Sequence, residues 1–557
     1  AIRSPITPFI PRELDDAGVE KQLDDIATAA ARARQAGYDG VEVMGSEGYF
    51  LNQFLVTHTN KRTDRWGGCY ENRMRAPIEA VRRARAATGP DFIIIYRLSM
   101  IDLIPNGSNW AEVVQLAKAI QAAGATIINT GIGWHEARVP TIATSVPRRA
   151  FTWVTRKLMG QVGVPLITSS RINTPEVAEQ VLAGGCADIV SMARPFLADP
   201  DFVAKAREGR AASITPCIAC NQACLDHTFE MKPASCLVNP RAGTETELIY
   251  TPTDRPKSLA VVGAGPAGLS AALVAAQRGH LVTLFEKSAQ IGGQMNLAKM
   301  IPGKEEFQGL LAYYGRELER SGVSLRVNTS ATPKMLQPFD DVIIATGVRP
   351  RDPQISGQDG PNVLTYAEVL RAKAAVGQRA AIIGAGGIGF DVAEYLVQSG
   401  VSPTENPDLW RAEWGVSDPA RDRGGLDPSG PHPEPPARQV FLLQRKAQKI
   451  GRGLGKTTGW IHRLTLKRKG VQMIAGVNYE RIDRDGLHIS FGADRDNPKL
   501  LAVDTVVLCA GQEPERTLAD ALSNSGKPVH VIGGADEAVE LDAKRAIAQG
   551  SRLAASL

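Results

Sequence analysis

Residues 1–213 alternate short apolar runs with longer stretches in which apolar residues recur every three or four positions. A short apolar run predicts a buried strand, and the longer periodicity predicts an amphipathic helix. The predicted strands are Asp39–Gly45, Phe92–Leu98, Ala125–Gly131, Val164–Ser170 and Ala187–Ala193. Because apolar strands joined by helices form a parallel sheet covered on both faces, this segment predicts an α/β fold.

Strand–helix repeats without a dinucleotide fingerprint are typical of a (β/α)8 barrel, whose catalytic groups lie on the loops after the strands. Five strands are present here rather than eight, and the sequence opens at Ala1 in a loop-like stretch, SPITPF. We therefore expect residues 1–212 to form a partial (β/α)8 barrel with its N-terminal strands missing, about three βα units.

Two polar residues stand where loops follow the predicted strands. Tyr49 comes four residues after the first strand, and His135 follows the third strand in the stretch HEARV. A phenol and an imidazole at a barrel mouth suit proton transfer; the alternatives are a core aromatic and an ordinary loop histidine. The HEARV stretch is no zinc-binding HExxH motif, since the second histidine is absent.

Three arginines, Arg97, Arg171 and Arg194, also stand at strand ends. Flavin mononucleotide (FMN) needs a cation near its N1/O2 edge, and cations or backbone N–H groups at its phosphate. A surface salt bridge is the alternative for any one of these arginines, but three of them at the same rim favour a flavin site.

Four of the seven cysteines lie between Thr215 and Arg241, with the spacing C-x2-C-x3-C-x11-C. They are Cys217, Cys220, Cys224 and Cys236. Three close cysteines and a remote fourth favour a [4Fe–4S] cluster in residues 213–250. Zinc is the alternative, although it usually takes two separated CxxC pairs. Disulfides are disfavoured because nothing else in the chain suggests secretion.

The stretch Ser258–Lys287 reads strand, glycine-rich turn, helix, strand, and then the acidic residue Glu286. Its glycines are Gly263, Gly265 and Gly268. They allow a tight turn and close approach to a pyrophosphate, and the acid can bind a ribose hydroxyl. The chain continues into IGGQ, which ends at Gln294, and later into Ile343–Pro350. Residues 251–360 are therefore predicted to begin an FAD-binding domain.

A second fingerprint occupies Arg379–Leu396, within a predicted NADP-binding domain of residues 361–505. Its glycines are Gly384, Gly386 and Gly389. A Pro/Gly-rich insert, about Ser399–Arg438, is expected to be irregular. The next strand ends in Arg445 and Lys446, which suit the 2′-phosphate of NADPH; the alternative is a solvated basic strand end.

Residues 506–557 are predicted to return to the FAD-binding domain, so that the NADP-binding domain is inserted in it. Val506–Pro514 resembles the earlier stretch Ile343–Pro350, in which an apolar strand is followed by the turn sequence ATG. Val529–Gly550 contains a strand, a Gly-Gly turn beside Asp536, and a terminal helix. The stretch GRGLGKTTG is no phosphate loop, because Ile450 stands where its first glycine is required.

The bulk composition is that of a globular protein, 43% hydrophobic and 22% charged over 557 residues. A net charge of +5 without a basic stripe argues against a nucleic-acid partner. The sequence offers no signal peptide and no apolar run of the length that a membrane span needs. Cys69, Cys186 and Cys509 show no pairing pattern. Together these features predict a cytoplasmic protein with no membrane partner.

The order of partial barrel, four-cysteine segment, FAD fold and NADPH fold resembles the iron–sulfur flavoenzyme branch of the Old Yellow Enzyme family. Within it, the chain is most similar to members that reduce 2,4-dienoyl-CoA thioesters with NADPH. Ordinary enone reductases of the family have a His and an Asn five and two residues before the tyrosine, where this chain has Met44 and Glu47. Trimethylamine dehydrogenase-like members begin the cluster segment with CxxCxxC, whereas this chain has CxxCxxxC. The stretches that carry the resemblance are VMGSEGYFLNQFL, IIIYRLSM, INTGIGWHEARVPTIAT, SMARPFLAD, CIACNQACLD, SCLVNPRA, GRGLGKTTG and ELDAKRAIAQG.

The resemblance implies roles for the candidate residues. Tyr49 is expected to donate a proton with His135 as its partner, and the four cysteines to hold [4Fe–4S]. The residues expected at FMN are Arg97, Arg171, Ala193 and Arg194. Electrons would pass from NADPH through FAD, the cluster and FMN to a 2,4-dienoyl-CoA, in the β-oxidation of unsaturated fatty acids by a monomeric enzyme. The alternatives are a related ene-reductase, an amine dehydrogenase, or an electron-transfer remnant without substrate reduction.

Overall fold

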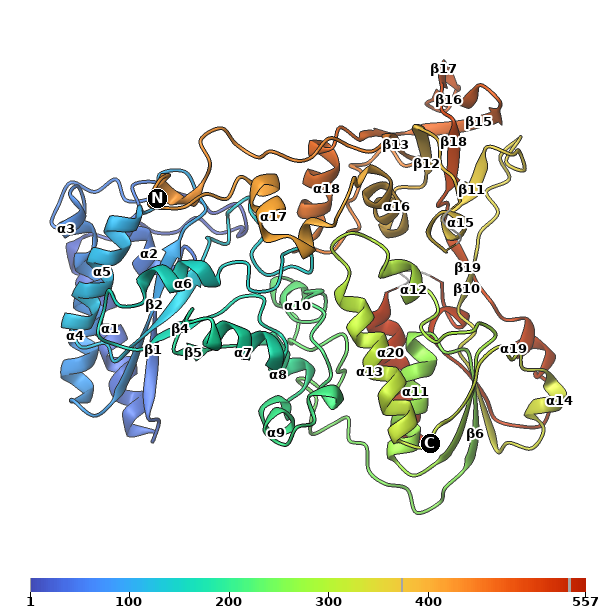
Figure 1. Ribbon diagram of the computed structural model, residues 1–557, viewed down its shortest axis with the longest axis horizontal. Helices are drawn as coiled ribbons and strands as arrows, with labels where there is room; N and C mark the ends of the chain where they lie inside the picture. Colours follow the sequence, from blue (N-terminus) through green and yellow to red (C-terminus); the bar gives the residue numbers. More distant parts are fainter. Residues whose placement is uncertain (1, 372–373, 539–541) are drawn as a thin grey trace. The chain divides into compact units, whose positions relative to one another are not determined.

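The computed structural model describes residues 2–371, 374–538 and 542–557 (Figure 1). They form two compact units. The first, here called the barrel unit, comprises Ala1–Ile142, Val146–Ala193 and Pro403–Pro433. The second, the nucleotide unit, comprises Ala143–Ser145, Arg194–Ser402 and Glu434–Leu557. Residues 540 and 541, which begin the ELDAKRAIAQG stretch, lie outside the described residues.

The barrel unit contains a parallel sheet whose strands follow one another in chain order, β1-β2-β3-β4-β5. The strands are β1 (Gly40–Gly45), β2 (Ile93–Ile101), β3 (Ile127–Ile132), β4 (Leu166–Thr168) and β5 (Ile189–Val190). The helices are α1 (Asp16–Gln35), α2 (Phe50–Leu55), α3 (Tyr70–Arg73), α4 (Arg75–Thr88), α5 (Trp110–Ala122), α6 (Thr152–Leu158) and α7 (Pro175–Ala183). The five parallel strands predicted from the apolar runs are thus confirmed.

Local sequence determines where the helices that follow β2 and β4 begin. Asn109 caps α5 by accepting the Glu112 N–H, and the Glu112 side chain accepts the Asn109 N–H in return. Thr174 caps α7, whose first residue is Pro175. These caps fix the ends of two strand-end loops, which is where a barrel carries its functional groups.

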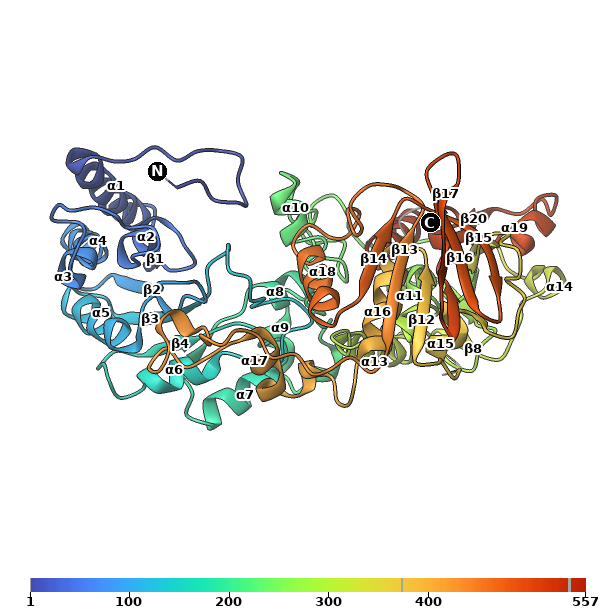
Figure 2. The ribbon, with the colours of Figure 1, turned by 90° about the horizontal axis from the view of Figure 1, so that it is seen from above.

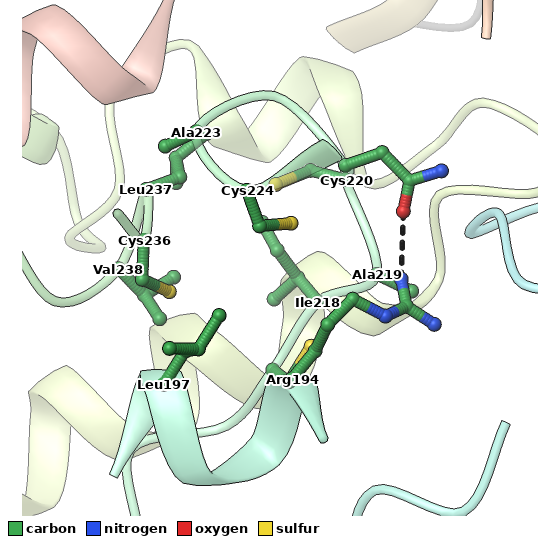
Figure 3. Close-up of a pocket in the computed structure, with 12 residues that line it drawn as sticks. Arg194, Leu197, Ile218, Ala219, Cys220, Ala223, Cys224, Cys236, Leu237 and Val238 are labelled. Carbon is green, nitrogen blue, oxygen red and sulfur yellow. Dashed lines mark hydrogen bonds between the residues drawn. The ribbon is translucent and has the colours of Figure 1, made fainter. Parts of the chain in front are cut away.

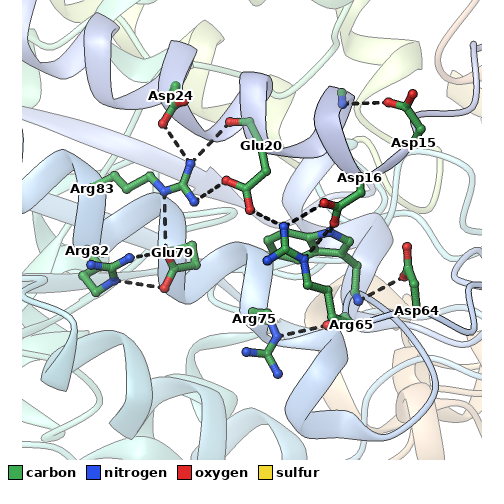
Figure 4. A network of polar contacts seen from close by, with 12 residues as sticks. Asp15, Asp16, Glu20, Asp24, Asp64, Arg65, Arg75, Glu79, Arg82 and Arg83 are labelled. Carbon is green, nitrogen blue, oxygen red and sulfur yellow. Dashed lines mark hydrogen bonds and ion pairs between the residues drawn. The ribbon is translucent and has the colours of Figure 1, made fainter.

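Ion pairs orient α1 against α4 and against the loop that precedes α3 (Figure 4). Arg83 of α4 lies 2.5 Å from Glu20 and 2.8 Å from Asp24. Arg65 of the loop lies 2.7 Å from Asp16 and 2.6 Å from Glu20. Because exposed ion pairs contribute little stability, we attribute the packing of α1 mainly to its buried apolar residues, Val19, Leu23 and Ala30.

The nucleotide unit starts with short helices around the cysteine segment, α8 (Arg194–Ala198), α9 (Phe202–Arg207) and α10 (Leu225–Phe229). The first nucleotide fold follows, on the parallel sheet β20-β9-β6-β7-β8. Its strands are β6 (Ser258–Val262), β7 (Leu281–Phe285), β8 (Ser324–Arg326), β9 (Asp341–Ile344) and β20 (Val529–Val531). Its helices are α11 (Pro266–Gln277), α12 (Met295–Ala298), α13 (Glu306–Arg320), α14 (Pro333–Leu336), α19 (Thr517–Ala521) and α20 (Ala543–Ser556).

The second nucleotide fold has the parallel sheet β11-β18-β12-β13-β14. Its strands are β11 (Val363–Thr365), β12 (Arg379–Ile383), β13 (Gln439–Gln444), β14 (Gln472–Ala475) and β18 (Thr505–Leu508). Its helices are α15 (Tyr366–Arg371), α16 (Gly387–Val397) and α18 (Gly459–Arg468). Antiparallel additions are β15 (Val477–Asp483), β16 (Gly486–Phe491) and β17 (Asp496–Leu501), and the pair β10 (Val348–Pro350) and β19 (Gln512–Pro514).

The prediction that the chain returns to the FAD-binding domain at residue 506 is contradicted by strand β18. It pairs with β11 and β12, so position 506 falls inside a strand of the second fold. The chain returns to the first fold only afterwards, through β19 and β20. The apolar strand and following turn look alike in the two folds, and sequence similarity alone cannot say to which sheet such a strand belongs.

The insert between α16 and β13 folds with the barrel unit, where Figure 2 shows it in orange beside α6. Its helix α17 (Pro407–Trp414) buries Trp410 edge-to-face against Phe151, with ring centroids 5.6 Å apart. Lys157 of α6 lies 2.6 Å from Asp418 Oδ2. The prediction that this insert is irregular is wrong for Pro407–Trp414, which form α17. The Pro/Gly-rich composition carries no periodicity from which the contact with the barrel unit could be predicted. No helix within the described ranges is long and apolar enough to cross a membrane.

Candidate functional site

Tyr49 and His135 meet at the carboxyl ends of β1 and β3. His135 Nε2 lies 3.1 Å from Tyr49 Oη, and the two rings pack edge-to-face with centroids 5.2 Å apart. The loops also touch through the backbone, since the His135 N–H donates to the Glu47 carbonyl at 3.4 Å. Tyr49 is 48% exposed. The two residues singled out from separate loops therefore form one hydrogen-bonded pair that a substrate can reach.

Charges around the phenol disfavour its ionisation. Partial burial raises the pKa of Tyr49, and the carboxylates of Glu47 and Glu136 raise it further, while Arg97 opposes them. A proton donor must hold its proton until the substrate needs it, and this environment has that effect.

A row of polar side chains crosses the first three strands beside this pair. Arg97 Nε lies 3.1 Å from Glu47 Oε1, and Arg97 Nη1 lies 3.7 Å from Glu42. Asn129 Nδ2 donates to Glu42 Oε2 at 2.7 Å. Sequence reasoning identified Arg97 but missed Glu42 and Asn129. The available signal was a polar residue inside each apolar run. The parallel register pairs Arg97 with Asn129, while Glu42 is paired with Ile95, two residues from Arg97 on the same face of the sheet.

The two other residues predicted at FMN in this unit occupy different environments. Arg171 is buried, 3% exposed, with a left-handed φ of +56°, and its Nε donates to the Val146 carbonyl at 2.8 Å. Ala193 is exposed and follows β5. A buried arginine with a strained backbone is unusual and indicates a functional constraint. The contacts of both residues with FMN stay a prediction.

The four cysteines line one cavity of the nucleotide unit (Figure 3). Cys217 is buried, and the other three are half-buried. Ala219 and Asn221 lie between the first three cysteines and have left-handed φ values of +53° and +64°. Such values are strained for alanine, so the loop is bent to bring its cysteines around a common point.

Burial disfavours the ionisation of three of these thiols, those of Cys220, Cys224 and Cys236. Burial raises the pKa of Cys220 and Cys224, and raises that of Cys236 to about 12. Thiolates at such positions require a bound cation, which inverts this tendency. Among the described residues, no group of three or more His, Cys, Asp or Glu side chains is arranged around a single metal ion. Four cysteines lining one cavity are a donor set of the kind that a [4Fe–4S] cluster takes, and the cluster stays a prediction.

Arg194 lines the same cysteine cavity, and its Nη1 donates to Asn221 Oδ1 at 2.7 Å. Its charge opposes the burial effect on the pKa of Cys224. The structure therefore places this predicted FMN residue at the cysteine loop; an additional contact with FMN stays a prediction.

The Gly451–Gly459 stretch, excluded above as a phosphate loop, contacts the cysteine segment. Asp226 Oδ1 accepts the Thr457 N–H at 2.7 Å and the Thr457 hydroxyl at 2.5 Å. Lys456 Nζ donates to the Phe229 carbonyl at 2.9 Å. The second nucleotide fold thus helps to hold the helix that follows Cys224.

The first glycine-rich turn has the geometry that a dinucleotide site needs. Gly263 has φ of +105°, and a Cβ on Gly268 would overlap the Gly263 carbonyl. A Cβ on Gly265 would meet no described atom within 4 Å, which leaves room for a pyrophosphate. Glu286 is buried, and its carboxylate accepts the Ala264 N–H at 2.8 Å. The acid therefore lies directly beside the turn, as a ribose-binding acid should.

Two further residues predicted at FAD lie in polar contacts of the nucleotide unit. Gln294 Oε1 accepts from Gln512 at 3.1 Å, and its amide donates to Tyr366 at 3.3 Å. Asp536 follows the short 3₁₀ turn Gly533–Ala535 and accepts from Gln549 at 2.8 Å. Their contacts with FAD stay predictions.

The second glycine-rich turn repeats the first. Gly384 has φ of +112°, and a Cβ on Gly389 would overlap its carbonyl. A Cβ on Gly386 would again meet no described atom within 4 Å. Arg445 and Lys446 follow β13 directly and are exposed, so they are free to reach a phosphate that binds near the strand end.

Two segments of the chain match known protein families. Residues 2–213 match the NADH:flavin oxidoreductase / NADH oxidase family, and residues 257–540 match pyridine nucleotide-disulphide oxidoreductase. The fold and sites thus define a flavin-dependent, NAD(P)H-linked oxidoreductase. The chain belongs to the iron–sulfur flavoenzyme branch of the Old Yellow Enzyme-like NADH:flavin oxidoreductases, in which such a barrel and such a nucleotide domain are joined.

Three similar proteins represent this branch. A metal reductase from Desulforamulus reducens is 37% identical over 540 residues, which are 96% of this chain and 79% of that protein. A bilirubin reductase from Mediterraneibacter gnavus is 30% identical over 549 residues, 97% of this chain and 78% of that protein. The solved complex of 2-naphthoyl-CoA reductase with 2-naphthoyl-CoA has a TM-score of 0.88 and 30% identity, and the match covers 100% of this chain and 79% of that one.

Proposed function

We propose that this chain catalyses NADPH-dependent reduction of 2,4-dienoyl-CoA thioesters. The observation that carries the proposal is the Tyr49–His135 pair, 3.1 Å apart on strand-end loops of a flavin-oxidoreductase barrel. The similar 2-naphthoyl-CoA reductase supports a CoA thioester as the substrate class. Naphthoyl-CoA and dienoyl-CoA both place carbon–carbon double bonds in conjugation with a thioester carbonyl, which makes the distal carbon a hydride acceptor.

The residues of the chain fit four bound groups. When bound, NADPH would supply a hydride, FAD and FMN would supply hydride-accepting and hydride-donating flavins, and the cluster would carry single electrons. The proposed sites are the Gly263 turn with Glu286 for FAD, the Gly384 turn with Arg445 and Lys446 for NADPH, the four cysteines for [4Fe–4S], and Arg97 and Arg171 for FMN.

Tyr49 supplies the proton that completes the reduction. Hydride addition to the distal carbon leaves an electron pair delocalised over the dienolate. That pair forms a new C–H bond with the proton of Tyr49 Oη, and the phenolate is left behind. His135 Nε2, at 3.1 Å, can return a proton to it.

Tyr49→Phe tests this role, with Tyr38→Phe as a matched control because Tyr38 is an exposed tyrosine just before β1. We expect flavin reduction by NADPH to be unchanged in both variants. Product formation should fall roughly 10²–10⁴-fold in Tyr49→Phe alone, which is the usual contribution of a positioned acid. An unchanged rate of product formation and an unchanged product in Tyr49→Phe would contradict the proposed role of Tyr49 as proton donor.

An anaerobic count of FAD, FMN, iron and sulfide per polypeptide tests the cofactor assignments separately. We expect FAD, FMN and four irons. FAD and iron without FMN would instead favour an electron-transfer role that does not include substrate reduction.

A further inference from the structure

Asp102 is a fully buried carboxylate just beyond β2, and the proposed chemistry does not use it. It accepts hydrogen bonds from the Ser99 hydroxyl at 2.7 Å, the Ser108 N–H at 2.6 Å, Trp134 Nε1 at 3.0 Å and Asn52 Nδ2 at 3.4 Å. Burying a carboxylate is costly unless its oxygens are hydrogen-bonded. These donors come from β2, from α2 and from the loops that follow β2 and β3, so Asp102 ties these segments to a single point.

Two of the donors lead directly to the catalytic pair. Asn52 also accepts the N–H of Gly48, the residue before Tyr49, at 2.9 Å. Trp134 is the residue before His135, and its backbone N–H donates to the Asp102 carbonyl at 2.9 Å. A Cβ on Gly48, which has φ of +83°, would lie 2.7 Å from the Trp134 ring. The Tyr49 loop and the His135 loop therefore close on each other beside Asp102.

The insert holds the loop that supplies the Ser108 donor. Gly424 accepts the Leu103 N–H at 2.8 Å and donates its own N–H to the Ser108 carbonyl at 2.9 Å. Arg423 lies 2.8 Å from Glu112 and donates to the Gly107 carbonyl at 2.9 Å. A Cβ on Gly424 would overlap the Ile104 carbonyl, so the two backbones approach as closely as only glycine allows.

We infer that Asp102 is a positioning residue that fixes the distance between Tyr49 and His135, and that the Arg423–Gly424 part of the insert holds Asp102's loop in place. The inference rests on the proposed proton transfer, because it concerns the geometry of that pair. An amide in place of the carboxylate would present N–H groups to at least one donor. That donor would lose its acceptor, and the loop that carries it would shift.

The test uses the holoenzyme with Asp102→Asn. Asp188→Asn is the control, since its carboxylate also accepts a backbone N–H, that of Leu166 at 2.8 Å, but at the opposite ends of the strands. We expect Asp102→Asn to leave flavin reduction by NADPH and the KM for 2,4-dienoyl-CoA unchanged. The kcat for product should fall by about 10²-fold, the effect of misplacing a catalytic group by about 1 Å. The control should keep both values.

Hydrogen exchange on the holoenzyme gives a readout that does not depend on activity. Asp102→Asn and Gly424→Ala should each speed amide exchange in residues 48–52 and 133–136, while exchange in β4 stays unchanged. Unchanged exchange together with unchanged kcat would overturn the inference. If Tyr49→Phe slows product formation but Asp102→Asn does not, the positioning role alone fails. If Tyr49→Phe has no effect, the proposed proton donor fails, and the hydrogen-exchange result still decides whether Asp102 ties the loops together.

Discussion

The two glycine-rich turns of the nucleotide unit are close structural repeats that differ at the end of the next strand. In each turn the first glycine has a left-handed φ, and a Cβ on the last glycine would overlap its carbonyl. After β7 the chain places Glu286, whose buried carboxylate accepts the Ala264 N–H. After β13 it places the exposed cations Arg445 and Lys446. The two turns share one backbone geometry, and we propose that each binds a pyrophosphate while the strand end selects the nucleotide.

Closing each turn should have the largest effect. Gly268→Ala should abolish FAD retention, because the new Cβ would overlap the Gly263 carbonyl. Gly389→Ala should leave FAD bound and abolish reduction by NADPH, since its clash is with Gly384. Flavin absorbance after gel filtration and anaerobic NADPH titration measure the two losses. Gly309→Ala in α13 is the control, where a Cβ would meet no described atom within 4 Å. Loss of FAD in Gly389→Ala would show that the two turns are not independent.

Removing the acid of the first fold should have an intermediate effect. In the protein the Glu286 carboxylate accepts hydrogen bonds from the Ala264 and Ser288 N–H groups, each at 2.8 Å. The neutral amide of Glu286→Gln has one acceptor oxygen and no charge, so it cannot replace both charge-assisted bonds. Charge-assisted hydrogen bonds are worth about 1.5–3 kcal/mol, so we expect FAD affinity to fall roughly 10–100-fold. Equilibrium titration of the FAD-free protein measures this. An unchanged affinity would mean that the acid serves only the fold of the turn.

Neutralising the strand end of the second fold should have a smaller and selective effect. The double variant Arg445→Ala, Lys446→Ala should lower kcat/KM for NADPH about tenfold or more and leave NADH nearly unchanged, because only NADPH has a 2′-phosphate. Steady-state flavin reduction with both nucleotides provides the comparison. Equal loss with both would support a solvated strand end without a nucleotide contact.

The smallest effect should come from the packing of the second fold. His462 of α18 lies 2.7 Å from Glu394 of α16. Burial opposes protonation of His462, but the charge of Glu394 outweighs it and raises the pKa. Stabilisation by the charged pair is therefore complete below the unfolded pKa of 6.5 and is lost as pH rises through the folded value. Relative to wild type, His462→Gln should lower the melting temperature by roughly 2 °C at low pH, and less at high pH. A difference that does not depend on pH would contradict this pairing.

The sequence predicted features that depend on local pattern and missed those that depend on register. Apolar runs located the five strands of the barrel unit, and the glycine spacing located both turns. The Glu42–Arg97–Asn129 row arises only when three parallel strands align, which no single stretch reveals. The docking of the insert likewise depends on Gly424 meeting a loop some 300 positions earlier in the chain, at Ile104.

The cysteine loop was likewise predicted from its local pattern but not in its contacts with other segments. Spacing identified its four cysteines, but the Arg194–Asn221 and Asp226–Thr457 contacts join segments with no shared motif. Sequence similarity to the first fold also placed the domain boundary at 506, inside β18 of the second sheet. Duplicated folds are therefore predicted well in their turns and less well in the assignment of individual strands.

The most direct test of the proposed function is a single turnover. The holoenzyme, reduced without oxygen by one equivalent of NADPH, is mixed rapidly with a 2,4-dienoyl-CoA, and flavin absorbance and product are followed together. We expect the flavin to be reoxidised and one enoyl-CoA to form for each NADPH consumed. Flavin that stays reduced in the presence of the thioester would contradict dienoyl-CoA reduction as the function of this chain.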